Sequence, residues 1–212
     1  MAANALYAEE LLVGLFLDIF TKVFFILSPF FSVSMFLLLS GQMDRPTRRH
    51  CALRTSLAIL VVCFVVYFLG NMIFRVLGIT VPAFQVGAGT LLFLTAVNMV
   101  SGKRSEIVSD PDDDFAVVPL AIPMIVGPGT IGTLLVLGVE IDQTDQKLIA
   151  AGAILLAVVM ISLFLFLAVP IGRLLGQKGL NMMMKLTGLV LTAIAAQIIF
   201  AGARALLGLP RV

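Results

Sequence analysis

Long apolar segments and short polar segments alternate along the chain. The apolar runs reach about 20 residues or more, which is the length that a membrane-spanning helix needs. None of these runs shows the period-two alternation expected of barrel strands. The pattern therefore predicts an all-α integral membrane protein with six transmembrane helices, placed near residues 10–39, 51–77, 82–100, 116–139, 147–171 and 185–208.

Composition supports this class of protein. Of the 212 residues, 60% are hydrophobic and 12% are charged, against roughly 25% charged residues in an average soluble domain. The first ten residues contain no Lys or Arg. The positive start of a cleavable signal peptide is therefore missing, and we expect the first span to be retained.

The distribution of lysine and arginine predicts the orientation in the membrane. Nine of these residues lie at the odd-numbered loops, after the first, third and fifth spans: Arg45, Arg48, Arg49, Arg54, Lys103, Arg104, Arg173, Lys178 and Lys185. Four lie on the opposite side of the predicted membrane: Arg75, Lys147, Arg204 and Arg211. By the positive-inside rule the odd-numbered loops are cytoplasmic and both termini lie outside. Because topology explains the basic residues, they give no reason to expect a nucleic-acid partner.

Helix-breaking residues interrupt two of the predicted spans. The fourth span contains Gly127-Pro128-Gly129, and the first span contains Pro29. Proline removes a backbone donor and glycine adds conformational freedom, so both helices are expected to break at these points. Broken backbone within a membrane is tolerated only where protein or a water-filled cavity satisfies its polar groups. Each break is therefore a candidate binding site.

The two halves of the chain resemble each other. A shift of 99 residues aligns three pairs of landmarks, and a shift of 98 aligns residues 75–78 with residues 173–176. The three pairs are Pro29 with Pro128, Gly89 with Gly188, and Asn98 with Gln197. Coincidence is the alternative, because glycine and leucine are common in membrane helices.

A duplication divides the chain into a first repeat over 1–100, a polar cytoplasmic linker over 101–115 and a second repeat over 116–212. Each repeat has three spans, so the second enters the membrane in the opposite sense. Two inverted three-helix repeats with matching interrupted helices are a plan typical of secondary transporters.

The two breaks suggest what such a site would bind. The helix that begins after a break offers free N–H groups to a carboxylate, and the helix that ends before it offers carbonyls to an ammonium group or a cation. Two opposed breaks can therefore hold a small zwitterion, which glycines without side chains would allow to approach closely. The alternative is that the prolines only kink packed helices. The candidate substrate-binding residues are Ser28, Pro29, Phe30, Ser32, Gly127, Pro128, Gly129, Thr130 and Thr133.

Four other polar residues lie within the predicted spans. Asp18 and Lys22 are spaced to pair on one helix face, and they are candidates either for coupling or gating or for a plain interfacial ion pair. Asn98 and Gln197 are single amides in apolar helices. Burial would require them to find hydrogen-bond partners, so we interpret them as scaffold residues, with ligand contact as the alternative.

The sequence contains no constellation that predicts catalysis, metal binding or a cofactor site. Cys51 and Cys63 are twelve residues apart on one predicted helix, too far to form a disulfide with each other. The acidic run Asp110–Asp114 lacks the spaced oxygens and glycine turn of a calcium loop. We therefore expect neither an enzyme nor a metalloprotein.

The segment Pro119–Thr130 reads Pro-Leu-Ala-Ile-Pro-Met-Ile-Val-Gly-Pro-Gly-Thr, and it is accompanied by Phe84-Gln-Val-Gly-Ala-Gly89, Leu175-Gly-Gln-Lys-Gly179 and Leu186-Thr-Gly-Leu189. On these motifs, which extend over nearly the whole chain, the protein resembles the MarC family. This family is also called the neutral amino acid transporter family, within the LysE exporter superfamily. The resemblance implies a six-helix inner-membrane protein and uptake or export of small neutral amino acids such as glycine and alanine.

The chain departs from the family pattern at the first break. The family motif reads Asp-Pro-x-Gly-Asn, whereas this chain has Ser28-Pro29-Phe30-Phe31-Ser32. The carboxylate that would bind a coupling proton or sodium ion is therefore absent from the first break.

The hypothesis is a secondary transporter of a small neutral amino acid, embedded in the lipid bilayer and working by alternating access, with H⁺ or Na⁺ as candidate coupling ions. The oligomeric state is left open. The alternatives are a non-transporting regulatory or assembly module and an ion-selective path.

Overall fold

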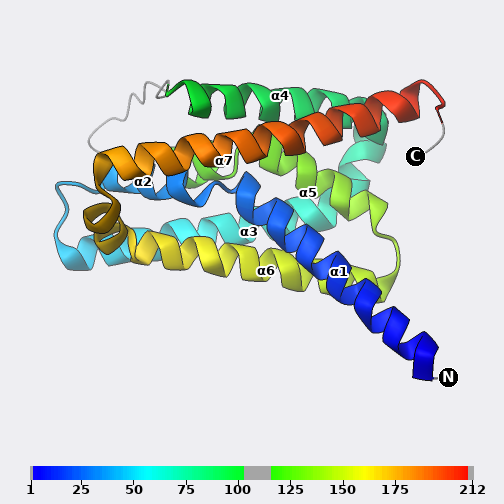
Figure 1. The fold of residues 1–212 in the computed structure, drawn as a ribbon, viewed down its shortest axis with the longest axis horizontal. Helices are drawn as coiled ribbons and strands as arrows, with labels where there is room; N and C mark the ends of the chain where they lie inside the picture. The colour runs from blue at the N-terminus through cyan, green and yellow to red at the C-terminus, as the bar shows by residue number, and fades with distance from the viewer. Residues whose placement is uncertain (1, 103–115, 210–212) are drawn as a thin grey trace.

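The computed structural model describes residues 2–102 and 116–209, with side chains for residues 11–70, 72–102, 120–122 and 124–209. All regular secondary structure in this part of the chain is helical (Figure 1). The elements are α1 Ala2–Ile26, α2 Pro29–Leu39, α3 Arg45–Leu77, α4 Val81–Ser101, the π-helix η1 Ala116–Ile125, α5 Pro128–Glu140, α6 Thr144–Phe166 and α7 Ala168–Leu206.

The predicted class, an all-α integral membrane protein, is confirmed. Among the described residues, five helical segments are long and apolar enough to cross a membrane: Leu11–Leu39, Arg45–Gly70, Val81–Ser101, Thr144–Phe166 and Ala168–Leu206. The predicted fourth span forms two shorter helices, η1 and α5, on either side of its predicted interruption. The 13 residues of α5 extend only about 20 Å, so the structure contains five full-length candidates and one short apolar helix rather than six equal spans.

Both predicted helix interruptions are present. Ser28 separates α1 from α2 and has a left-handed backbone, with φ 51° and ψ 72°. Gly127 separates η1 from α5 in an extended conformation, with φ −82° and ψ 178°. Pro29 and Pro128 are the first residues of the helices that follow. Proline suits this position because its missing N–H would have no intrahelical acceptor there.

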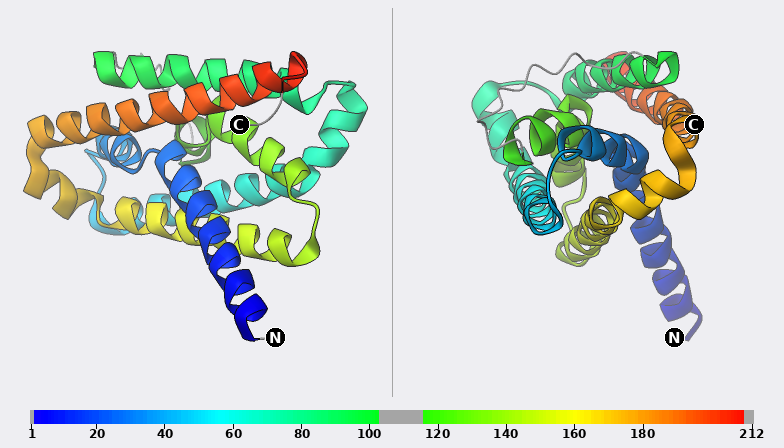
Figure 2. Two further views of the ribbon diagram at one scale, coloured as in Figure 1. Left: turned by 45° about the vertical axis from the view of Figure 1, so that its right-hand side comes forward. Right: turned by 90° about the vertical axis from the view of Figure 1, so that its left-hand side faces the viewer.

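The interrupted helices occupy the middle of the bundle. In Figure 1, α2 and α5 lie between the pair α4 and α7 and the pair α3 and α6. The end-on view in Figure 2 places α2 near the centre. The pair α4 and α7 forms the most extensive helix contact and runs antiparallel, because Gly89 faces Ile199 and Gly188 faces Ala96.

The outer faces of the helices are apolar. Val61, Val65 and Phe68 recur at helical spacing on α3, and each is about half exposed. A soluble protein rarely leaves such a stripe uncovered. A lipid-facing helix requires one, because hydrocarbon favours apolar side chains.

The connections rich in arginine gather at one end of the bundle. The turn from α2 to α3, the junction of α6 and α7, and the end of α4 all lie at the left of Figure 1, and both termini lie at the right. Lys103, Arg104 and nearly all of the predicted linker 101–115 lie outside the described residues.

Candidate functional site

Serine hydroxyls satisfy the first break. The Ser28 hydroxyl donates to the carbonyl oxygens of Phe25 (3.2 Å) and Ile26 (3.3 Å), and the Ser32 hydroxyl donates to the carbonyl oxygen of Leu27 (2.9 Å). These carbonyls belong to the last two residues of α1 and to Leu27, which follows it, where the regular helix hydrogen bonds end. Each carbonyl oxygen has two lone pairs, so these hydrogen bonds do not test whether the carbonyls bind a cation, and that role stays a prediction.

Removing the Ser32 hydroxyl is expected to destabilise the protein. Ser32 is fully buried, so the variant Ser32→Ala leaves the carbonyl of Leu27 without this donor at a cost of about 1–3 kcal/mol. Thermal unfolding of the purified protein measures the loss. The control is Ser34→Ala, because Ser34 is also buried on α2 but bonds to no described residue. Equal melting temperatures for the two variants would contradict the capping role.

The second break leaves two backbone donors without partners. Val126 completes the π-helix by donating to the carbonyl oxygen of Ala121 at 2.9 Å. Pro128 has no N–H, and the amides of Gly129 and Thr130 find no hydrogen-bond acceptor among the described residues. Both residues are buried. Two buried amides at a helix N-terminus favour a bound anion, because the helix dipole adds to their partial positive charge.

The two predicted threonines differ in what their hydroxyls do. The Thr133 hydroxyl donates to the carbonyl oxygen of Gly129 at 2.9 Å, within α5. The Thr130 hydroxyl bonds to no described residue, although only 3% of Thr130 is exposed. Thr130 therefore adds an uncommitted hydroxyl to the two amides at the start of α5.

Gly129 makes a helix contact. A Cβ atom on residue 129 would lie 2.6 Å from Cδ1 of Leu92 on α4, and Gly132 faces Ala88 on the same helix. The prediction that the bare Gly129 backbone admits a substrate is wrong on this side, because α4 occupies the space.

Both breaks border α4. The Ser28 hydroxyl lies 4.0 Å from the Met99 sulfur, and Gly129 packs on Leu92. Seven residues separate Leu92 and Met99, or about 10 Å along a helix. The structure therefore brings the two breaks to points about two turns apart on one helix.

The remaining predicted residues of the breaks contribute to packing or face outward. Phe30 packs edge-to-face against Phe164 of α6, with ring centroids 5.8 Å apart. Pro29 is buried, whereas Pro128 is exposed. The aromatic contact ties the first turn of α2 to the second half of the chain.

Asp18 and Lys22 form the expected ion pair on α1. The Lys22 ammonium lies 2.7 Å from the Asp18 carboxylate, and the side chains are 39% and 54% exposed, respectively. Ten residues, about 15 Å of helix, separate Asp18 from Ser28. The pair lies outside the two breaks, and its coupling or gating role stays a prediction.

Another amide takes the place of the predicted scaffold pair. Asn98 and Gln197 are exposed, and their side-chain amides form no hydrogen bond with the described residues. Gln85 is buried on α4 and donates to the carboxylate of Glu140, at the end of α5, over 2.9 Å. A signal existed in the sequence: Gln85 lies four and seven residues before Gly89 and Leu92, on the face of α4 that packs inside the bundle.

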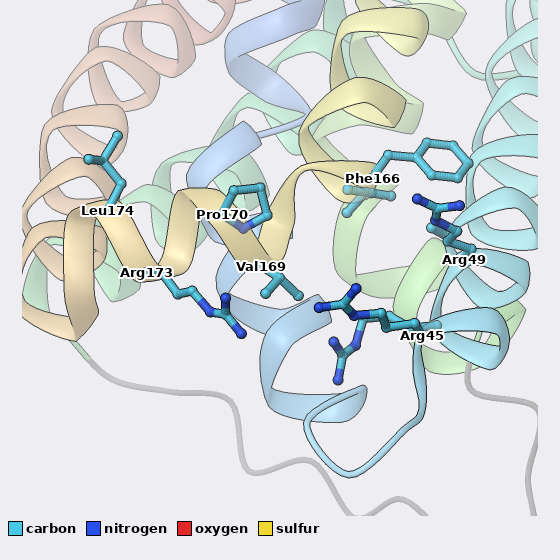
Figure 3. Close-up of a pocket in the computed structure, with 10 residues that line it drawn as sticks. Arg45, Arg49, Phe166, Val169, Pro170, Arg173 and Leu174 are labelled. Carbon is cyan, nitrogen blue, oxygen red and sulfur yellow. The ribbon is translucent and has the colours of Figure 1, made fainter.

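Sequence reasoning also missed a pocket at the basic end of the bundle. It has a volume of about 630 Å³ and lies between the start of α3 and the junction of α6 and α7 (Figure 3). From the sequence, we used the arginines of this pocket only to predict the membrane topology. The sequence does not show that Arg45 and Arg173 line the same pocket.

The described residues hold no group of three or more His, Cys, Asp or Glu side chains placed to bind a metal ion. Cys51 and Cys63 are buried and form no disulfide with each other. The acidic run Asp110–Asp114 lies outside the described residues.

Comparisons with known proteins agree with the helical membrane architecture. Residues 13–207 match the profile of a family described as MarC family integral membrane protein. A UPF0056 membrane protein of Aquifex aeolicus is 34% identical over 201 residues, covering 91% of this chain and 94% of the relative. Relatives with the same description come from Methanocaldococcus jannaschii, at 32% identity over 196 residues, and Pyrococcus horikoshii, at 30% over 202 residues. These alignments cover 89% and 92% of this chain, respectively, and 96% of each relative. No solved structure matches the chain. The names describe membrane proteins and specify no substrate.

Proposed function

Because the chain belongs to the MarC family of integral membrane proteins, we propose that it is a secondary transporter of small neutral amino acids in the inner membrane. One observation carries the proposal. The amides of Gly129 and Thr130 begin an interrupted helix inside the bundle, are buried, and have no acceptor among the described residues. A substrate carboxylate would satisfy both donors.

An inverted repeat supports alternating access as the mechanism. The helices that begin at Pro29 and Arg45 have counterparts that begin at Pro128 and Thr144, in each case 99 residues later. The helix pairs α3–α6 and α4–α7 run antiparallel (Figure 1). We propose that residues 1–100 and 116–212 are inverted copies, with η1 and α5 together forming the sixth crossing. The two copies then rock about the breaks to open the site to either side.

Two glycines with positive φ also lie at corresponding positions of the proposed repeats. Gly78, at the end of α3, has φ 64°, and Gly176, within α7, has φ 61°. These left-handed glycines are 98 residues apart. Positive φ strains other residues, so a glycine at each position fits a turn retained in both copies.

The substrate's ammonium group would lie at the first break. The hydroxyls of Ser28 and Ser32 donate to carbonyls there, and each keeps lone pairs that can accept a hydrogen bond from an ammonium group. Close packing of Gly129 and Gly132 on α4 leaves little room between α4 and α5. Both features favour a compact amino acid such as glycine or alanine.

In the proposed topology the arginine-rich end is cytoplasmic and both termini lie outside, following the positive-inside rule. If a cation couples transport, H⁺ and Na⁺ are the candidates. Ser28 carries no charge that could bind either ion at the break. The proposed coupling or gating group is therefore the Asp18–Lys22 pair.

A second candidate function is a membrane assembly module. The exposed amides of Asn98 and Gln197 lie on otherwise apolar helices, and such amides join helices of separate chains in membranes. This function would not need a ligand at Gly129 and Thr130, so a binding test separates the two candidates.

Alanine is expected to stabilise the purified protein. At a hundredfold excess over its dissociation constant a ligand adds about 2.7 kcal/mol, which corresponds to a rise in melting temperature of about 5–10 °C. The measurement is thermal unfolding with glycine or alanine, with and without sodium, across pH. Propionate lacks the ammonium group and ethylamine lacks the carboxylate, and neither should reproduce the shift. A protein that no amino acid stabilises under any of these conditions would favour the assembly module.

A further inference from the structure

The pocket at the basic end of the bundle concentrates positive charge. Its polar lining consists of Arg45, Arg48 and Arg49 from the first turns of α3 and Arg173 from α7 (Figure 3). None of the described residues that line it is acidic. The positive end of the α3 dipole adds to this charge.

Within the described part of the chain, no acidic side chain neutralises these arginines. Arg48 donates to the carbonyl oxygens of Ser40 (3.1 Å) and Met43 (2.8 Å), which fixes its side chain but leaves its charge. The side chains of Arg45, Arg49 and Arg173 form no ion pair or hydrogen bond with the described residues. Figure 3 shows Arg173 reaching from α7 toward Arg45. Like charges drawn together in this way are stabilised by an anion between them.

The other walls of the pocket are apolar and outward-facing. Phe166 at the end of α6 is 44% exposed, and Leu174 on α7 is 86% exposed. Two candidate spans, Arg45–Gly70 and Thr144–Phe166, respectively begin and end at this pocket. It therefore lies where the hydrocarbon of a bilayer gives way to its head groups.

We propose that this pocket binds the phosphate of an anionic phospholipid, with an acyl chain lying against Phe166. Guanidinium groups match phosphate oxygens in bidentate geometry, and basic pockets between membrane helices are suited to lipid head groups. The apolar wall distinguishes this ligand from a soluble phosphate, which would gain nothing from Phe166 or Leu174. A phosphate shared by Arg45 and Arg173 would tie the first half of the chain to the second. The proposal does not depend on the transported substrate.

Phosphatidylglycerol is expected to raise the melting temperature of the full chain in detergent, and phosphatidylcholine is not. In the variant Arg45→Gln/Arg49→Gln/Arg173→Gln, the half-saturating concentration of phosphatidylglycerol should rise about 100-fold, because each of the three basic residues contributes about a factor of five to anionic-lipid binding near a membrane surface. The side chains of these three arginines form no hydrogen bond or ion pair with the described residues. The variant should therefore keep the melting temperature of wild type in the absence of lipid. If it does not fold, Arg173→Gln alone should raise the half-saturating concentration about fivefold.

The control Arg75→Gln/Lys178→Gln/Lys185→Gln removes the same charge from residues that do not line the pocket. It should keep the wild-type response within about threefold. An equal rise in the half-saturating concentration in both triple variants would overturn the proposal, since lipid binding would then depend only on the net charge of the protein. An arginine-dependent rise in melting temperature with millimolar inorganic phosphate alone would also overturn it, by assigning the pocket to a soluble anion.

Discussion

Replacing Gly129 with leucine is expected to prevent α5 from packing on α4 and to leave little folded protein. A Cβ atom on residue 129 would lie 2.8 Å from Cβ and 3.2 Å from Cα of Leu92. The second atom is backbone, so a new rotamer of Leu92 cannot clear the space. Adding methylenes to a packed core costs about 1–3 kcal/mol, and an isobutyl group here should cost more. Size-exclusion chromatography and thermal unfolding after detergent extraction measure the loss.

The matched control is Gly87→Leu on α4. Gly87 is exposed, and no described atom lies within 4 Å of an added Cβ. Because glycine is a poor helix former, this variant should be as stable as wild type or more stable by up to about 1 kcal/mol. Similar yields and melting temperatures for the two leucine variants would show that α4 and α5 do not meet closely at Gly129.

The sequence was sufficient to predict the helices and both interruptions. Pro29 and Pro128 act through their own backbone geometry, so their effect does not depend on which helix lies beside them. The apolar runs were equally informative, because hydrocarbon thickness sets a minimum length that any span has to meet. The π-helical form of the proline-rich stretch before Gly127 was not predicted.

The sequence was insufficient to predict which polar groups meet. These helices are apolar almost all round, so the pattern does not show which face turns inward. Asn98 was interpreted as a scaffold residue and is exposed, whereas the buried Gln85 donates a hydrogen bond to Glu140. For the same reason the sequence did not predict the contact between Gly129 and Leu92, which depends on how α5 crosses α4.

The predicted site residues with hydroxyl groups are of two kinds, according to whether the hydroxyl donates a hydrogen bond within the protein. Ser28, Ser32 and Thr133 use their hydroxyl protons within the protein. Thr130 does not, so its hydroxyl can be removed without breaking a described hydrogen bond. A substitution at Thr130 therefore tests binding, whereas a substitution at Gly129 tests folding.

Replacing Thr130 with valine is expected to weaken substrate binding about 10- to 100-fold while the melting temperature without substrate stays close to that of wild type. Valine has nearly the same shape as threonine, and a hydrogen bond to a charged carboxylate contributes about 1.5–3 kcal/mol. Uptake of labelled alanine into proteoliposomes should show a raised KM, and the alanine-induced thermal shift should need correspondingly more ligand.

Thr133→Val provides the comparison, because its hydroxyl already donates to the Gly129 carbonyl within the helix. This variant should lose some stability and keep a KM within about threefold of wild type, since helix backbone carbonyls tolerate the loss of an extra side-chain donor. A KM for alanine that is unchanged in Thr130→Val would remove Thr130 from the site. If alanine binding were then also insensitive to every other change at the start of α5, the carboxylate would have to bind elsewhere, and the two buried amides would need another partner.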